Sequence, residues 1–247
     1  MLSSRAEILG IGGYRARFAS QPDDLDATRD LRSVCFGTGQ TDDDPFDRSC
    51  SHVLIEDTRS GDLVCAFRVL MLASGAEVVR SYSAQFYELS GLAKFSGPMI
   101  EIGRFCIHPD QKDPDILRLA WGALTCLVDK GDVKMLFGCS SFVGTDVAPY
   151  LDAFAVLKHR YLGPERWRPG IKVQNAFHFG AKVQHPHDLK RGMLDIPALL
   201  RSYLMMGGWV SDHAVVDIQI NTIHVFTGLE LRPITAKRQR LLRALGG

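Results

Sequence analysis

The chain has 247 residues, which is long enough to bury a sizeable core, and its 46% apolar and 23% charged residues are typical of a globular protein. A formal net charge of +1 argues against a nucleic-acid binder, which would usually be strongly basic. No apolar stretch approaches the roughly 20 residues of a membrane span, and the first residues lack a signal-peptide pattern. The six cysteines include no C-x-x-C pair, which predicts reduced thiols, no metal site and a cytoplasmic protein.

The first part of the chain predicts a strand, a helix and a hairpin. Residues 14–20 alternate as a strand does, and residues 21–36 follow with a Pro-Asp start and apolar side chains at near-helical spacing. After a polar loop, the apolar runs at 51–57 and 63–72 flank a tight turn and predict a β-hairpin. Because a hairpin lies among strands that otherwise alternate with helices, we expect a mixed sheet with helices on its faces.

The rest of the chain continues the alternation. A short helix is expected around 84–92, and a strand that starts at Met99 ends at a His-Pro-Asp turn. The pattern predicts one α/β domain over residues 1–247, with a basic tail at 235–247 that could be flexible and could lie on anionic lipid. The remaining expectations are helices at 114–131, 147–162 and 197–208, a strand at 134–143, an irregular stretch at 163–192 and a closing hairpin of 215–220 with 222–231.

Glu101 and Arg104 are charged residues in an otherwise apolar strand. Residues three apart in a regular strand point to opposite faces, but a bulge would bring both to one side, and Gly103 lies between them where a bulge forms easily. A bulge leaves backbone amides able to bind an extended ligand, and a carboxylate beside it could orient or deprotonate an ammonium group. The alternative is an ordinary ion pair on an exposed sheet face.

An acidic loop and a buried arginine form a second anomaly. Asp44 and Asp47 flank Phe46, which could fix the loop while the two acids face a cationic substrate, although a solvated turn rich in Asp would look the same. Arg68 lies inside the apolar run LVCAFRVLML and needs a partner, because an unpaired buried charge is very costly. Asp44, Asp47 and Glu101 are the candidates, so these charges could form one network.

Together these residues resemble two related families. Seven charged or aromatic residues, named at the end of this paragraph, occur in the same order as in acyl-homoserine-lactone synthases. Those synthases are GNAT-like enzymes that use acyl carrier protein as acyl donor. Longer segments, among them YLDAFAVLKHRYL and PALLRSYLMMGGWVSDHAVVD, resemble the ornithine lipid-forming N-acyltransferases over roughly residues 14–230. The tryptophan that lactone synthases normally carry after the first helix is absent here. The seven residues are Arg32, Phe36, Asp44, Asp47, Arg68, Glu101 and Arg104.

The resemblance implies a GNAT-like acyltransferase fold of class α/β, with a mixed central β-sheet flanked by helices. It implies transfer of a 3-hydroxyacyl chain from the phosphopantetheine thioester of acyl carrier protein to the α-amino group of L-ornithine, without a tightly bound cofactor. Glutamine is the alternative acceptor, since a net-acidic site would favour ornithine and a neutral site glutamine. A lactone synthase using S-adenosylmethionine and a non-catalytic acyl-binding protein are further alternatives. Peripheral contact with the inner membrane is also expected.

The same resemblance assigns roles to individual residues. Glu101 is the implied general base, directly or through a water, and Arg104 completes the catalytic pair. Where coenzyme-A-dependent relatives have a glycine-rich loop, this chain reads QKDPDI, which favours a carrier protein over coenzyme A. Arg32, Phe36, Asp44, Asp47 and Arg68 would hold the amino acid, while Gly103, Phe105, Cys106, Ile107, Ser140 and Ser141 would contact the acyl-phosphopantetheine arm.

Overall fold

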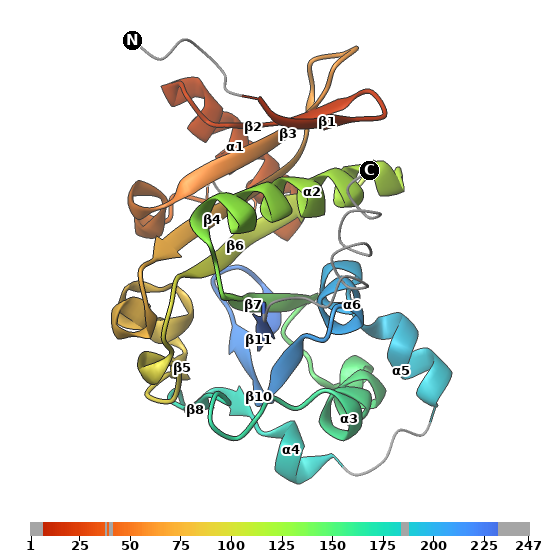
Figure 1. The fold of residues 1–247 in the computed structure, drawn as a ribbon. Helices are drawn as coiled ribbons and strands as arrows, with labels where there is room; N and C mark the ends of the chain where they lie inside the picture. The colour runs from red at the N-terminus through yellow and green to blue at the C-terminus, as the bar shows by residue number, and fades with distance from the viewer. Residues whose placement is uncertain (1–6, 38, 40–41, 184–187, 232–247) are drawn as a thin grey trace. The chain divides into compact units, whose positions relative to one another are not determined.

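The computed structural model describes residues 7–37, 39, 42–183 and 188–231, so the predicted basic tail at 235–247 lies outside the described residues. Strands and helices alternate, and the strands form a mixed sheet flanked by helices, as the sequence predicts (Figure 1). The chain divides into two compact units. Unit 1 consists of residues 1–71, 102–134 and 231–247, and unit 2 consists of residues 72–101 and 135–230.

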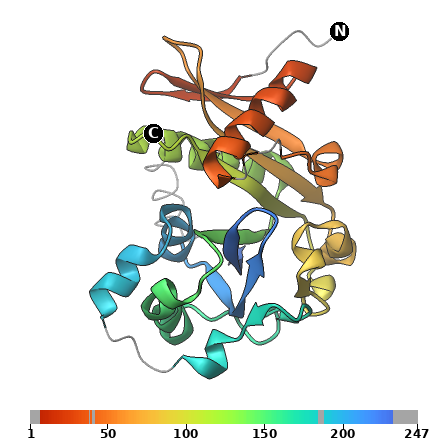
Figure 2. The same cartoon turned by 180° about the vertical axis from the view of Figure 1, so that it is seen from behind.

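Unit 1 contains a sheet in the order β1-β2-β3-β4-β6 with a helix on each face. The pairs β1–β2, β2–β3 and β3–β4 are antiparallel. Helix α2 lies in front of this sheet in Figure 1, and helix α1 lies in front of it when the molecule is seen from behind in Figure 2. The elements are β1 (Glu7–Ile11), β2 (Tyr14–Phe18), α1 (Pro22–Phe36), the 3₁₀ helix η1 (Pro45–Ser49), β3 (Ser51–Asp57), β4 (Leu63–Leu72), β6 (Met99–Ile107) and α2 (Pro114–Gly131).

Both helices of unit 1 begin where their sequence predicts. Pro22 occupies the first turn of α1, and Gln21 and Asp24 form a reciprocal capping box at its start. Helix α2 begins with Pro114 after Asp113, whose side chain accepts a hydrogen bond from the backbone N–H of Asp115. Capping thus satisfies backbone donors that the first helical turn leaves without a partner.

Strand β1 is an element that the sequence did not predict. The GIGG segment reads as a flexible lead-in, yet Ile11 pairs with Tyr14 across a two-residue turn. Gly12 and Gly13 occupy this turn with φ of 60° and 97°. A tight hairpin of this type needs positive φ at both central positions, which glycine adopts without steric cost. The two glycines therefore specify a hairpin.

Unit 2 contains a sheet in the order β7-β11-β10-β9, and its described residues form four α-helices as well as short 3₁₀ helices. Strand β11 pairs antiparallel with both β7 and β10. Strand β10 starts at Trp209, earlier than the predicted 215–220. The elements are η2 (Gly75–Arg80), η3 (Ser83–Gln85), β5 (Tyr87–Glu88), η4 (Leu92–Lys94), β7 (Met135–Val143), η5 (Ala148–Tyr150), α3 (Leu151–Arg160), β8 (Gly170–Ile171), β9 (Ala176–Phe177), α4 (Phe179–Lys182), α5 (Leu189–Asp195), α6 (Ala198–Met205), β10 (Trp209–Asp217) and β11 (Thr222–Glu230).

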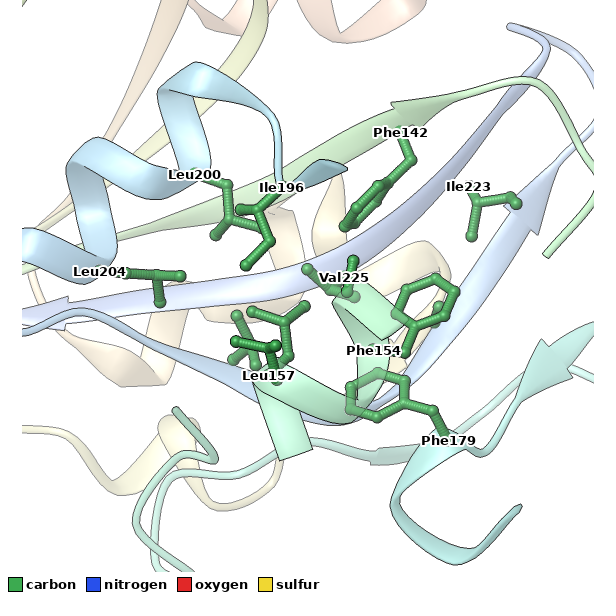
Figure 3. Close-up of a cluster of buried hydrophobic side chains, with 13 residues drawn as sticks. Phe142, Phe154, Leu157, Phe179, Ile196, Leu200, Leu204, Ile223 and Val225 are labelled. Atoms are coloured by element: carbon green, nitrogen blue, oxygen red, sulfur yellow. The ribbon is translucent and has the colours of Figure 1, made fainter. Parts of the chain in front are cut away.

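The core of unit 2 is an apolar cluster between its helices and one face of this sheet (Figure 3). Phe154 stacks on Phe179 with ring centroids 5.1 Å apart, and Phe142 tilts against Phe154 at 5.2 Å. Strand β11 contributes Ile223 and Val225 from alternate positions, which lie on the same face of the sheet. This packing fixes strand β7, which carries Ser140 and Ser141.

The predicted helix at 84–92 is replaced by two 3₁₀ turns and a short strand. Ser81 explains the difference, because its hydroxyl donates to the carbonyl of Val78 and accepts from the N–H of Ala84. Such local side-chain bonds compete with helix formation. The side chain of Tyr87 is buried, and its hydroxyl donates to the carbonyl oxygen of His224.

None of the described helices is long and apolar enough to cross a membrane.

Candidate active site

Five of the residues singled out in the sequence meet in a buried ion-pair network in unit 1. Asp47 is its centre, because its carboxylate accepts two hydrogen bonds from Arg32, at 2.9 and 2.6 Å, and one from Arg68 at 2.6 Å. The Asp47 and Arg68 side chains are each only 2% exposed. The bidentate contact between the Arg32 guanidinium and the Asp47 carboxylate fixes both groups in one geometry. Arg68 thus finds its partner in the acidic loop, as the sequence predicts.

Asp44 and Asp42 extend the network to a third arginine. Arg68 donates to Asp44 at 2.9 Å, and Arg104 approaches the same carboxylate oxygen to 2.7 Å. Arg104 also donates through Nε to Asp42 at 2.8 Å, and Arg32 lies 3.4 Å from that carboxylate. Three guanidinium groups therefore face three carboxylates, and the formal charges of these six side chains cancel.

Local structure brings the acids inward. Asp44 caps the 3₁₀ helix η1 by accepting from the N–H of Phe46, and Pro45 follows it in the first turn. The Phe46 ring lies 5.8 Å from the Arg68 guanidinium carbon, within the range of a cation–π contact. The loop is therefore an ordered turn with buried acids at Asp44 and Asp47, and the alternative of a fully solvated turn is wrong for these two residues.

The irregularity predicted at Gly103 falls one residue later. Arg104 has φ of 50°, in the left-handed region that residues other than glycine rarely adopt. Gly103 has a steric role instead, since a Cβ atom at this position would lie 3.2 Å from Nε of Arg68. The absence of a side chain at Gly103 thus makes room for Arg68.

Burial and ion pairing act against each other on the charged groups. Burial alone would raise the pKa of Asp47, but the hydrogen bonds and positive charge of Arg32, followed by those of Arg68, hold that pKa at about 2. Burial would lower the pKa of Arg68, yet attraction to Asp44 and bonding to Asp47 raise it above its ordinary value. Asp47 and Arg68 are therefore both ionised at neutral pH.

His52 and Asp42 belong to this network although the sequence did not single them out. His52 lies directly opposite Arg68 in the β3–β4 pairing, and its Nε2 atom is 3.2 Å from the carbonyl oxygen of Asp47. Because a carbonyl oxygen only accepts, Nε2 carries the hydrogen. Burial lowers the pKa of His52, so the imidazole is neutral at pH 7. The register shifts between Ile55 and Glu56, so counting residues from the hairpin turn would have paired His52 with Phe67 and could not have identified it.

Glu101 belongs to unit 2, and strand β6 passes into unit 1 after it. Its carboxylate is buried and accepts three hydrogen bonds, from the N–H of Tyr82 at 2.8 Å, the N–H of Ser83 at 2.7 Å and the hydroxyl of Ser83 at 2.6 Å. The three donors hold the carboxylate in one orientation. Glu101 is thus rigidly held by the turn at the start of η3.

The residues predicted to contact the acyl arm lie in both units. In unit 1, Phe105 stacks on Phe67 with ring centroids 5.3 Å apart, and Cys106 is buried. Phe36, which was predicted to hold the amino acid instead, packs against the cluster that contains Cys106. In unit 2, the buried Ser140 hydroxyl accepts a hydrogen bond from Thr227 at 2.9 Å, while Ser141 is half-buried. Gly103 and Ile107 lie with Phe105 and Cys106 in β6.

Metal ligation is not a feature of the described part of the chain, where no group of three or more His, Cys, Asp or Glu side chains could hold a metal ion. What the described residues offer is charge-assisted hydrogen bonding at the arginine–aspartate network and a buried carboxylate at Glu101. Such groups can orient an amino acid and accept a proton.

Comparison with known proteins shows the family to which this chain belongs. The sequence matches the family model described as "Acetyltransferase (GNAT) domain" over residues 32–122. It is 32% identical to an L-ornithine N(alpha)-acyltransferase of Rhodobacter capsulatus, over 92% of this chain and 93% of the relative. It is 25% identical to a protein of the same name from Brucella abortus, over 94% and 90%. Among solved structures, the AHL synthase LasI is 16% identical, with 94% of this chain and 95% of that chain covered and a TM-score of 0.49. The chain therefore belongs to the L-ornithine N(alpha)-acyltransferase family and is an N-acyltransferase with a GNAT domain.

Proposed function

We propose that this enzyme transfers a 3-hydroxyacyl chain from acyl carrier protein to the α-amino group of L-ornithine and releases a lyso-ornithine lipid. The observation that carries the proposal is the 32% identity, along nearly the whole chain, to a protein named L-ornithine N(alpha)-acyltransferase. Three further relatives with that name match 94% or more of the chain. The buried network supports the proposal because it offers both charges that a free amino acid can bind.

The start of helix α2 supports a carrier protein rather than coenzyme A as the donor. A helix N-terminus can bind a pyrophosphate through its free N–H groups. Here Asp113 already caps α2, and its carboxylate also accepts a hydrogen bond from the hydroxyl of Tyr14 at 3.2 Å. Asp115 adds a second carboxylate in the first turn, where it pairs with Arg118. Two carboxylates at this position disfavour an anionic pyrophosphate.

In the proposed reaction the α-amino nitrogen attacks the thioester carbonyl carbon. A C–N bond forms, the C–S bond breaks, and the α-ammonium group loses two protons in all. One proton ends on the phosphopantetheine sulfur, and the other passes to Glu101, directly or through a water, and then to solvent. The amides of Gly103 to Cys106 would pair with the acyl arm and polarise its carbonyl. No acyl-enzyme is required, because a positioned amine can react directly.

The acceptor would meet the arginine–aspartate network of unit 1. Asp44 and Asp47 would hold the ammonium groups, while Arg68 and Arg104 would fix these acids or bind the substrate carboxylate. Arg32 would hold Asp47, and Phe36 would contribute apolar contact at the same site. The cancelling charges of the network favour glutamine as a second candidate acceptor, since a net-acidic site would suit the side-chain ammonium of ornithine better.

Product analysis tests the proposal in one experiment. The purified protein is mixed with 3-hydroxyacyl carrier protein and equal amounts of ornithine, glutamine, lysine and S-adenosylmethionine, and products are identified by mass spectrometry. We expect N-acylated ornithine, and a parallel reaction with 3-hydroxyacyl coenzyme A should be much slower. If N-acylated glutamine is formed instead, glutamine is the acceptor. Free lactone, or intact carrier thioester with no acylated product, would refute the proposed function.

A peripheral contact with the cytoplasmic membrane is the final part of the proposal. The proposed product is a lipid, and the sequence ends in a basic segment with Leu241, Leu242 and Leu245 at spacings that suit one side of a helix. Basic side chains near anionic headgroups each contribute on the order of 1 kcal/mol to binding. The enzyme would therefore act in the cytoplasm and release its product at the membrane surface.

A further inference from the structure

Cysteine side chains far apart in the sequence meet beside the charged network of unit 1. Cys35 lies near the end of α1, and Cys106 lies near the end of β6. The Cys35 side chain packs against the apolar cluster that contains Cys106. The Cys35 sulfur is also 3.3 Å from the carbonyl oxygen of Ile107, and the Cys106 sulfur is 3.6 Å from that of Ala66. Both cysteines are free thiols that pack in the same apolar cluster.

The two thiols differ in reactivity. Cys35 is half-buried, and the interaction with the Cys106 thiol lowers its pKa although burial opposes the change. Cys106 is buried, and the same interaction, together with burial, raises its pKa well above the ordinary value. Oxidation selects the thiol with more thiolate character and better access to solvent. Cys35 should therefore react first, with Cys106 in place to react second.

We propose that Cys35 and Cys106 form a redox-sensitive pair whose oxidation links helix α1 to strand β6 by a disulfide. A peroxide is the oxidant. The Cys35 thiolate attacks one peroxide oxygen, the O–O bond breaks, and sulfenic acid and water are formed. The Cys106 sulfur then attacks the Cys35 sulfur, the S–O bond breaks, and a second water leaves. Two thiols are oxidised and one hydrogen peroxide is reduced to two waters.

The position of this pair connects it to the network. Arg32 precedes Cys35 by one helical turn, and Arg104 precedes Cys106 by two residues in β6. The disulfide would join the helix and the strand that supply two of the three guanidinium groups. A nearby alternative is Cys65, which interacts with both cysteines, but it is fully buried and burial raises its pKa strongly. Neither property favours Cys65 as the thiol that reacts first.

Peptide mapping tests the pair directly. The full-length protein is reduced, desalted and treated with increasing hydrogen peroxide, and then digested without reductant for mass spectrometry. We expect one intramolecular disulfide between Cys35 and Cys106, an intact mass lower by about 2 Da, and full reversal by dithiothreitol. Cys35→Ser and Cys106→Ser should each abolish the linked peptide. Cys126→Ser is the matched control, because Cys126 is also half-buried in unit 1 and should leave the linked peptide unchanged.

Three results would overturn the inference. The first is oxidation of Cys35 in the wild-type protein to sulfinic acid with no linked peptide formed. The second is a linked peptide that joins other cysteines, and the third is a linked peptide that persists in the Cys35→Ser variant. Because Cys106→Ser alters a core position and could unfold the protein, the half-buried Cys35→Ser variant decides the outcome, with circular dichroism as the check on its fold. These measurements do not use acyl transfer, so their failure is distinguishable from failure of the proposed function.

Discussion

Asp47→Asn should be the most destabilising single change in the charged network. The substitution removes a carboxylate that accepts three hydrogen bonds from Arg32 and Arg68 and leaves three buried guanidinium groups facing two carboxylates. Removing one partner of a buried ion pair typically costs about 3–5 kcal/mol, because the remaining charge stays buried without compensation. We therefore expect the free energy of unfolding to fall by about 3–5 kcal/mol at pH 7.

The pH dependence of this loss follows from the pKa of Asp47. That pKa is about 2 in the folded protein against an ordinary value of 3.8, which at ~1.36 kcal/mol per unit corresponds to about 2 kcal/mol of stability. Because the folded value is the lower one, this stability is present above the ordinary pKa and is lost as pH falls from about 5 to about 2. The asparagine variant has no such group. The difference between wild type and Asp47→Asn should therefore narrow by about 1 kcal/mol at pH 3, and by about 2 kcal/mol only below pH 2.

Urea unfolding at pH 7, 5 and 3, followed by tryptophan fluorescence and circular dichroism, measures both effects. Asp43→Asn is the matched control in the same loop, since the Asp43 side chain is 80% exposed and pairs with Arg29 at 3.2 Å. An exposed pair of this kind contributes at most about 1 kcal/mol. The reasoning fails if Asp47→Asn costs no more than Asp43→Asn, or if its cost at pH 3 equals its cost at pH 7.

Gly103→Ala should lower stability by about 1–3 kcal/mol, because the new Cβ crowds Arg68; an unchanged urea midpoint would contradict this. Glu101→Gln should lower turnover by roughly two or more orders of magnitude with the fold retained, and near-normal rates would exclude Glu101 as the base. Below pH 6.5 the unfolded chain binds a proton on His52 more readily than the folded protein, whose His52 pKa is lowered, so acidification lowers stability. His52→Gln should reduce this loss of stability, and identical pH profiles for the two proteins would count against it. Deleting residues 235–247 should weaken binding to anionic liposomes, and unchanged sedimentation with liposomes would reject a membrane contact through this segment.

The sequence predicted the centre of the network because buried charge follows a strict rule. An arginine inside an apolar strand must be paired, so Arg68 pointed to the acidic loop and to Asp44 and Asp47 within it. Asp42 was missed because three consecutive aspartates do not reveal which of them turn inward. His52 was missed because it alternates like any strand residue, and its role depends on the β3–β4 register.

The fold class could likewise be predicted, while its local departures could not. Hydrophobic periodicity and capping residues marked α1, α2 and the β3–β4 hairpin, since these signals act within a few residues. The left-handed backbone at Arg104 depends on the neighbours of β6, so the sequence suggested the adjacent glycine instead. The 3₁₀ turns after β4 depend on hydroxyl bonds of Ser81, which periodicity does not record.

The interleaving of the two units has a consequence for synthesis on the ribosome. Chains are made from the N-terminus, so Arg32, the acidic loop and Arg68 emerge first, followed by residues 72–101 of unit 2. Until Arg104 follows, two arginines face three aspartates, and the nascent network carries an uncompensated negative charge. The amide of Leu231, which bonds to the carbonyl of Lys134 at 2.8 Å, arrives later still. Unit 1 therefore cannot be completed from a single N-terminal fragment, and chains that stall before Arg104 are candidates for chaperone capture or proteolysis.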